Sequence, residues 1–144
     1  MKKKIRVVAA IIEKDEEILI ARRLYGNQAG KWEFPGGKYE EGETGEMAIK
    51  REIEEEFETE IEVRGLLGTI KHRYPEFDMT MDCFICRIKD GEMTLHDHSA
   101  VKWINPGKRG IEWAAADRKV IRMYKKVIKK QGKQPESNTS HKYR

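Results

Sequence analysis

The sequence predicts a protein of the α/β (α+β) class, in which strands and helices alternate along one chain. Its 144 residues are enough for a single domain with its own hydrophobic core. Two segments have the composition and periodicity of helices, namely residues 44–57 and the residues that follow 117. Four segments have the apolar alternation or β-rich composition of strands: 3–13, 18–20, 60–73 and 77–88. This alternation is typical of domains in which helices cover a sheet.

The first two strands are expected to form a hairpin. The polar segment Glu13–Glu17 separates residues 3–13 from Ile18–Ile20, so the two strands can pair with each other. The second strand ends at Arg23, next to a polar loop.

A further, short strand is expected at Trp32–Phe34, and it leads directly into a tight loop at Gly36 and Gly37. Glycines in such a loop let backbone amides and carbonyls approach a ligand without obstruction by side chains. The loop in turn leads into the predicted helix over residues 44–57.

This helix is expected to have one apolar edge and one acidic edge. Thr44 is a candidate N-cap, and no proline occurs between it and Phe57. At about 100° per residue, Ile49 and Ile53 share an edge with Phe57. The neighbouring sector holds three carboxylates: Glu52, Glu55 and Glu56.

The three carboxylates point to a metal site. Like charges one helical turn apart repel each other, and a hard divalent cation removes that cost. Mg²⁺ prefers carboxylate oxygens, water and substrate phosphates, so the pattern suggests a metal site that a phosphorylated ligand completes. The alternative is a solvated acidic face of a helix, and the glycine loop, the apolar edge and Arg51 favour the metal site over it.

The same segment resembles the Nudix box, G-x5-E-x7-R-E-U-x-E-E-x-G-U, where U is a bulky aliphatic residue. The late glycine of that pattern is replaced by Glu58, and the aliphatic position after it holds Thr59. A glutamate in a left-handed helix terminus costs roughly 1 kcal/mol, so we expect either a strained exit or a slightly longer helix. The residues that match are Gly37, Glu43, Arg51, Glu52, Ile53, Glu55 and Glu56.

The resemblance covers roughly residues 3 to 130 and implies a Nudix α/β/α sandwich. In that fold a mixed β-sheet lies between the Nudix-box helix and a C-terminal helix. Nudix enzymes hydrolyse nucleoside diphosphates linked to another group, with Mg²⁺ or Mn²⁺ as the cofactor. By resemblance, a backbone carbonyl of Gly36 or Gly37 joins the metal shell formed by the acidic edge of the helix.

The resemblance also assigns catalytic roles. Metal ions held by Glu52, Glu55 and Glu56 would neutralise phosphate oxygens and lower the pKa of a bound water. Arg51 would hold the carboxylates in place, and Glu43 could help to orient them. Glu52 and Asp97 are both candidates for the general base, and the sequence does not choose between them.

Five residues are assigned to substrate binding. An arginine at the position of Arg23 contacts substrate phosphates in MutT-like members of the family, and Lys38 belongs to the same set. Phe34 or Phe77 could stack on the base, although either could equally belong to the core. Asp117, when ionised, accepts hydrogen bonds only, and would therefore favour an exocyclic amino group such as that of cytosine or adenine.

The overall layout looks like the MutT branch, and most like its CTP pyrophosphohydrolase group. We expect cleavage of a nucleoside triphosphate to the monophosphate and pyrophosphate, with preference for CTP, dCTP or a modified cytidine nucleotide. The alternatives are MutT-like removal of oxidised purine nucleotides, hydrolysis of ADP-ribose or a similar substrate, and a module that binds nucleotides without catalysis. A monomer and a homodimer are both compatible with the sequence.

The remaining polar motifs are interpreted as structural. Cys83 and Cys86 lie three apart in a strand predicted to be central, so they should face opposite sides as buried free thiols. His96 and His98 flank Asp97, but the sequence offers no further nitrogen or sulphur ligands for a transition metal. A loop through Glu112–Asp117 is expected to lead into the last helix.

Charge is unevenly distributed along the chain. Residues 118–144 contain ten of the 29 Lys and Arg residues but only one of the 25 acidic residues. A basic end can bind nucleic acid, but apolar residues at helical intervals favour a solvated face of a packed helix. Residues 1–130 are expected to form the Nudix domain, followed by a polar, disordered tail at 131–144. Without a membrane span or a signal-peptide core, a cytoplasmic location is expected.

Overall fold

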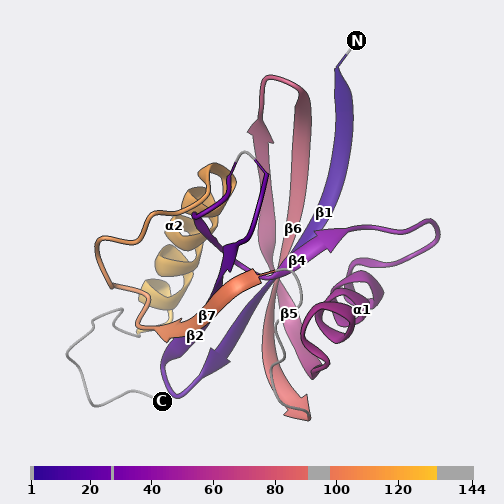
Figure 1. Cartoon of the computed structure of the whole chain (residues 1–144). Coiled ribbons are helices and arrows are strands. Elements are labelled where there is room, and N and C mark those ends of the chain that lie inside the picture. The colour runs from indigo at the N-terminus through magenta and orange to yellow at the C-terminus, as the bar shows by residue number, and fades with distance from the viewer. Residues whose placement is uncertain (1, 27, 91–97, 133–144) are drawn as a thin grey trace.

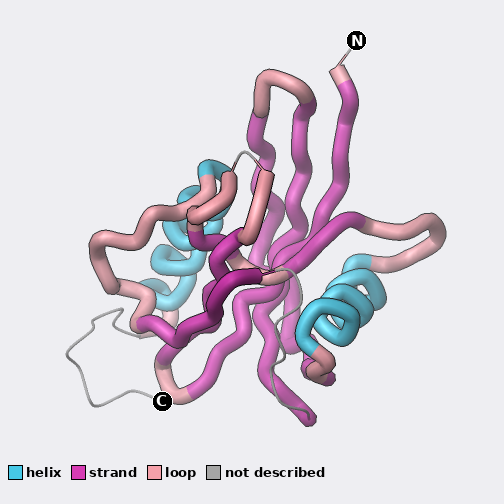
Figure 2. The backbone as a smooth tube through the Cα atoms, in the orientation of Figure 1, coloured by secondary structure: helices cyan, strands magenta, loops and turns pink. Residues whose placement is uncertain are grey.

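The structure is a computed structural model that describes residues 2–26, 28–90 and 98–132. A mixed sheet lies between two helices, with α1 and α2 on opposite sides of it (Figures 1 and 2). The elements are β1 Lys3–Lys14, β2 Glu17–Arg23, β3 Trp32–Glu33, β4 Gly36–Lys38, α1 Gly45–Phe57, β5 Glu60–Arg73, β6 Phe77–Asp90, β7 His98–Ile104 and α2 Ala115–Lys130. The α/β/α sandwich predicted for the family is therefore confirmed.

The sheet is organised around β1, which has neighbours along its whole length. The main strand order is β3-β2-β1-β6-β5, with β4 also paired to β1 and β7 to β2. The pairing of β1 with β6 is parallel, from Lys3 opposite Phe77 to Ile12 opposite Cys86, and the other strand pairs are antiparallel. As predicted, β6 is an interior strand of the sheet, and the sheet is mixed.

The predicted N-terminal hairpin is confirmed, and its turn is short. Glu13 and Lys14 pair with the first residues of β2, so Asp15 and Glu16 alone form the connection. Both have positive φ angles, 51° and 72°. Two-residue turns of this conformation match the twist of the flanking strands. The hairpin thus turns the chain back so that Arg23 lies at the far end of β2.

Each face of the sheet is covered by one helix. The buried residues of α1 form one core with β1 residues such as Val8 and Ala10, whereas Val120 and Tyr124 of α2 pack with Ala9 and Ile11. Alternate residues of β1 therefore serve different cores, as strand geometry requires. The two cysteines follow the same rule, because Cys83 lies in the α2 core and Cys86 in the α1 core, both as buried free thiols.

The glycine segment was predicted as a loop, and this was wrong. Gly36 and Gly37 belong to the short strand β4 and pair with Ala9 and Val8 of β1. A Cβ on Gly36 would overlap the backbone oxygen of Val8, so only glycine permits this approach. The loop between the glycines and the helix begins after Lys38 instead.

The start of α2 also differs from the prediction. The loop expected through Asp117 ends at Ala114, and Ala115–Lys130 are helical. Ala114 donates its backbone N–H to Trp32 O (2.8 Å), and the N–H of Ala115 is bound by Gln28 Oε1 (3.1 Å). These contacts from distant segments stabilise a helix start that has no side-chain N-cap of its own.

Some expectations concern residues outside the described ranges. Asp97 and His96 fall in the segment 91–97, and most of the tail falls in 133–144, so the structure does not address their predicted roles. Within the described residues, none of the helices is sufficiently long and apolar to cross a membrane.

Candidate active site

The candidate site is a cavity of about 550 Å³ beside β4 and α1. Its walls come from the start of β1, the end of β2, strand β4, one edge of α1, the start of β6 and the first turn of α2. Most of the residues assigned to the site from the sequence line this one cavity: Arg23, Phe34, Gly36, Gly37, Lys38, Glu52, Glu56, Phe77 and Asp117.

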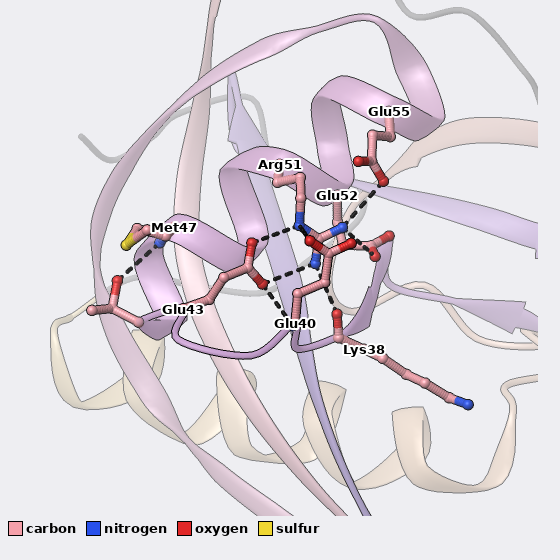
Figure 3. Close-up of polar contacts among 8 residues, drawn as sticks. Lys38, Glu40, Glu43, Met47, Arg51, Glu52 and Glu55 are labelled. Carbon is pink, nitrogen blue, oxygen red and sulfur yellow. Dashed lines mark hydrogen bonds and ion pairs between the residues drawn. The ribbon is translucent and has the colours of Figure 1, made fainter.

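Arg51 connects α1 to the loop that precedes it. Its Nε and one terminal nitrogen donate to the two carboxylate oxygens of Glu43 at 2.6 and 3.0 Å, and the same terminal nitrogen donates to Lys38 O at 2.9 Å (Figure 3). The other terminal nitrogen donates to Glu52 and Glu55, both at 3.1 Å. The guanidinium thus joins the acidic edge of α1 to the end of β4.

Hydrogen bonding and burial in this network shift the pKa values of Glu43, Arg51 and Glu52. The hydrogen bond from Arg51 lowers the pKa of Glu43, and Glu43 in turn raises the pKa of Arg51. Burial raises the pKa of the Glu52 carboxyl, and the hydrogen bond from Arg51 opposes that rise. Glu52 is therefore a carboxylate whose ionised form gains from a nearby cation.

Glu52 lies directly against the backbone of Gly37. A Cβ on that glycine would overlap the carboxyl group of Glu52, so glycine is required for the observed position. The carboxylate is thereby held beside the peptide groups of β4, where a backbone carbonyl and a carboxylate can share one cation.

The other two acids of the edge are placed differently. Glu56 lines the cavity together with Glu52, whereas Glu55 is not among the residues that line it. The side chain of Glu55 is 58% exposed and bonded to Arg51. Among the described residues, no three His, Cys, Asp or Glu side chains are gathered closely enough to form a metal cluster. A third carboxylate ligand would require Glu55 to turn from Arg51 towards the cavity.

The substrate side of the cavity has a paired cation. Arg23 donates to Glu33 Oε1 at 2.9 Å, and both residues line the cavity. Lys38 is exposed and lines the same cavity. Phe77, at the start of β6, is half-buried, and its ring lies 5.0 Å from that of Tyr74. Tyr74 and Glu33 also line the cavity, and neither was assigned to the site from the sequence.

Phe34 and Asp117 lie in the interior end of the site. Phe34 is 3% exposed and stacks on Trp113 with ring centroids 5.2 Å apart, so much of its surface belongs to the core. Its backbone N–H donates to Asp117 Oδ1 at 2.8 Å. Burial, with a smaller contribution from Glu33, raises the pKa of Asp117 to about 8. At neutral pH this carboxyl is therefore protonated in a large fraction of molecules, and in that form it can donate a hydrogen bond as well as accept.

Comparison with known proteins agrees with this geometry. The NUDIX domain family model matches residues 7–123, which include the glycine strand, α1 and the start of α2. The chain belongs to the Nudix family. The family predicted from the spacing of the box residues is thus confirmed.

Two Nudix relatives with similar sequences are named for activity on nucleotides. An 8-oxo-dGTP diphosphatase of Proteus vulgaris is 38% identical over 95 residues, which cover 65% of this chain and 85% of the relative. A CTP pyrophosphohydrolase of Escherichia coli is 38% identical over 117 residues, which cover 72% and 78%. The solution structure of the Escherichia coli ORF135 protein is 31% identical with a TM-score of 0.79, covering 92% of this chain and 96% of the other.

This Nudix chain is therefore a hydrolase of the nucleotide pyrophosphatase class, in the MutT-like branch. The relatives do not agree on the base, since one is named for an oxidised guanine nucleotide and another for CTP. The choice of substrate therefore depends on the groups that line the cavity of this chain.

Proposed function

We propose that this Nudix hydrolase is a Mg²⁺-dependent nucleoside triphosphate pyrophosphohydrolase that prefers cytidine nucleotides. The observation that supports the proposal is that one cavity is lined by three kinds of group. Acids of α1 (Glu52 and Glu56), cations (Arg23 and Lys38) and a buried carboxyl (Asp117) all border it. Together they match the metal, the phosphates and the base of a single nucleotide.

The residues present suit a hard divalent cation. Glu52 and Glu56 border the cavity, Glu55 is one helical turn from both Glu52 and Arg51, and Gly37 leaves room for close approach to the β4 backbone. A Mg²⁺ or Mn²⁺ ion bound there would supply charge neutralisation for phosphate oxygens and a more acidic water.

The reaction requires few groups from the protein. A water molecule attacks phosphorus, the bridging bond between the α and β phosphates breaks, and the monophosphate and pyrophosphate leave. Among the described residues, Glu52 is the candidate to accept the proton of the water, because its carboxylate borders the cavity beside the backbone of Gly37. Asp97, the other candidate for this role, lies outside the described residues. Arg23 and Lys38 would hold the phosphates, Arg23 by leaving Glu33.

Base preference depends on Asp117. A carboxyl group that can accept from an exocyclic amino group, and donate when protonated, complements the adjacent N3 and amino group of cytosine. The name of the CTP pyrophosphohydrolase relative supports the same preference. MutT-like hydrolysis of an oxidised purine nucleotide is the second candidate, supported by the name of the Proteus relative.

A substrate panel with product identification tests the proposal. CTP, dCTP, 5-methyl-dCTP, GTP, 8-oxo-dGTP and ADP-ribose would be compared at equal concentration with Mg²⁺, with the products separated by chromatography. We expect cytidine triphosphates to give the highest kcat/KM and to yield monophosphate and pyrophosphate. A panel led by 8-oxo-dGTP, with cytidine compounds inert, would contradict the base preference while retaining the reaction type.

The same panel should be run with Glu52→Gln as a control for contaminating pyrophosphatase. Activity that survives in this variant does not come from the proposed site. Binding of nucleotides without turnover of any substrate would instead support a non-catalytic module.

A further inference from the structure

A second cavity lies on the α2 side of the molecule and differs sharply from the active site in charge. It is a groove of about 550 Å³ between α2 and the segment 108–113. Of the residues that the structure describes, none lines both this groove and the active-site cavity. Among the described residues that line it, none is acidic, and its cations are Lys108, Arg109, Arg118, Arg122, Lys125, Lys126 and Lys129.

The cations of α2 form one stripe. At about 100° per residue, Arg118, Arg122, Lys125, Lys126 and Lys129 fall within roughly a 100° sector of the helix. The stripe is about 16 Å long at a rise of about 1.5 Å per residue. Lys108 and Arg109 add cations from the opposite wall of the groove. The groove therefore has basic residues on both walls, and the sequence alone showed only those on the face of the helix.

The cations of this groove lack acidic partners among the residues that the structure describes. The ion pairs of the described part of the chain join residues outside the groove, such as Arg51 with Glu43 and Lys50 with Glu46. Arg122, Lys126 and Lys129 are exposed. Seven uncompensated cations repel each other, and a polyanion in the groove would remove that repulsion.

The shape and the apolar residues of the groove indicate which polyanion fits. Trp113 and Ile121 form part of its floor and are almost fully buried, and Ile111 is partly buried. The groove therefore presents little of the apolar surface that membrane insertion requires. Along one strand of a duplex, phosphates advance by about 3.4 Å, so a stripe about 16 Å long spans about five of them. The buried floor also offers no exposed aromatic ring on which bases could stack.

We propose that this groove, formed by Lys108, Arg109 and the basic stripe of α2, binds a nucleic-acid strand through its phosphodiester backbone, without reading the bases. This places a nucleic-acid surface on the side of the sheet opposite α1 (Figure 1). The chain can then hydrolyse nucleotides while it is held on RNA or DNA.

The proposal is tested by fluorescence anisotropy with the full chain. A labelled 20-nucleotide single-stranded RNA, a DNA duplex of equal phosphate number and anionic lipid vesicles would be titrated between 50 and 200 mM salt. We expect binding to one or both nucleic acids and little dependence on sequence. About five contacts predict a slope of log K against log salt of roughly −3.5 for the single-stranded RNA and roughly −4.5 for the duplex. The RNA and DNA arms show which strand is preferred.

The decisive variant reverses two exposed charges of the groove, Arg122→Glu with Lys126→Glu. We expect nucleic-acid binding to weaken by about tenfold or more and the salt slope to become shallower by more than one unit. The matched control, Arg64→Glu with Arg87→Glu, makes the same charge change at exposed positions that do not line the groove, and should bind almost normally. Both variants should keep the wild-type melting temperature and wild-type nucleotide hydrolysis.

Several results would overturn the proposal. Equal loss of binding in both variants would show an effect of net charge alone, and binding to vesicles without nucleic acid would identify a membrane surface instead. A lower, salt-dependent kcat/KM for nucleotides in the groove variant, without nucleic-acid binding, would show that the groove steers substrate. None of these results depends on the base preference proposed for the active site.

Discussion

The carboxyl group of Glu52 occupies the space that a side chain on Gly37 would need. A Cβ at Gly37 would overlap this carboxyl, although the backbone of Gly37 is not in the left-handed region and would accept alanine. The first glycine of the Nudix box and its central glutamate are therefore coupled by contact rather than by backbone conformation.

Gly37→Ala should consequently impair catalysis more than folding. The methyl group would push the Glu52 carboxylate away from β4, and a displacement of about 1 Å at a reacting centre can lower the rate by about 10²-fold. Pyrophosphate release with Mg²⁺ and the melting temperature would be measured together. Turnover close to that of the wild type in a folded Gly37→Ala protein would show that the position of Glu52 is not critical.

The acids of α1 should differ in their effects from a neighbouring acid on the same helix. Glu55→Gln and Glu56→Gln are expected to lower kcat by about 10²-fold or more if both groups bind the metal. Glu54→Gln removes an exposed carboxylate that does not line the active-site cavity, and it should retain full activity. The series would be assayed across a range of Mg²⁺ concentrations. Rescue of Glu55→Gln or Glu56→Gln by excess Mg²⁺ would indicate weakened metal binding, whereas equal activity of all three variants would contradict the metal assignment.

Arg51→Lys should show whether the fork of hydrogen bonds matters. Lysine keeps the charge but cannot bind Glu43 through two nitrogens while also reaching Glu52 and Glu55. Loss of partners that orient metal ligands typically lowers activity or metal affinity by about 10- to 100-fold. The readout is kcat together with the Mg²⁺ concentration for half-maximal activity. If lysine retains both values, charge alone holds the carboxylates.

Much of this architecture was predictable because it depends on local sequence. The N-cap at Thr44 follows from residue type. The apolar edge of α1 and the opposite orientation of Cys83 and Cys86 follow from periodicity, and the structure confirms all three features. The left-handed exit at Glu58 was one of the two alternatives expected there.

Other features depend on contacts between distant segments. The strand conformation of Gly36 and Gly37 arises from pairing with β1, and the helical start at Ala115 is stabilised by Trp32 and Gln28. The hydrogen bond from Phe34 to Asp117 joins residues 83 positions apart. Neither local propensity nor hydrophobic pattern contains this information, so these parts of the site could not be placed from the sequence.

Asp117 should make the stability of the protein depend on pH. Its folded-state pKa of about 8 is well above the ordinary value of 3.8, so folding favours the protonated form. The resulting stabilisation is complete below about pH 4 and is lost as the pH rises towards 8. Asp117→Asn keeps an oxygen that can accept from Phe34 N–H and cannot ionise. Each unit of pKa shift is worth about 1.4 kcal/mol, so the variant should gain more than about 1 kcal/mol relative to the wild type between pH 5 and 8.5.

Urea denaturation of both proteins at pH 5 and pH 8.5 would measure this difference in the free energy of unfolding. Parallel pH dependence in the wild type and Asp117→Asn would show that the carboxyl is ionised in the folded state. The base preference of Asp117→Asn, measured on the same substrate panel, would separately test the assignment of this residue to the nucleobase.

The end of α1 offers a test of helix termination that does not involve the chemistry. Glu58 has φ 53° and ψ 41°, and its backbone N–H donates to Glu54 O at the helix terminus. A non-glycine residue pays about 1 kcal/mol or more in this conformation, partly offset by the greater freedom of glycine in the unfolded chain. Glu58→Gly should therefore stabilise the protein by a few tenths to about 1 kcal/mol while leaving hydrolysis unchanged.

The matched variant Glu54→Gly introduces the same residue one turn earlier, inside the helix, and should destabilise the protein by about 1 kcal/mol. Chemical denaturation of both variants measures the change in the free energy of unfolding. A requirement for positive φ predicts an increase at position 58 and a decrease at position 54, whereas a general effect of glycine predicts the same sign at both.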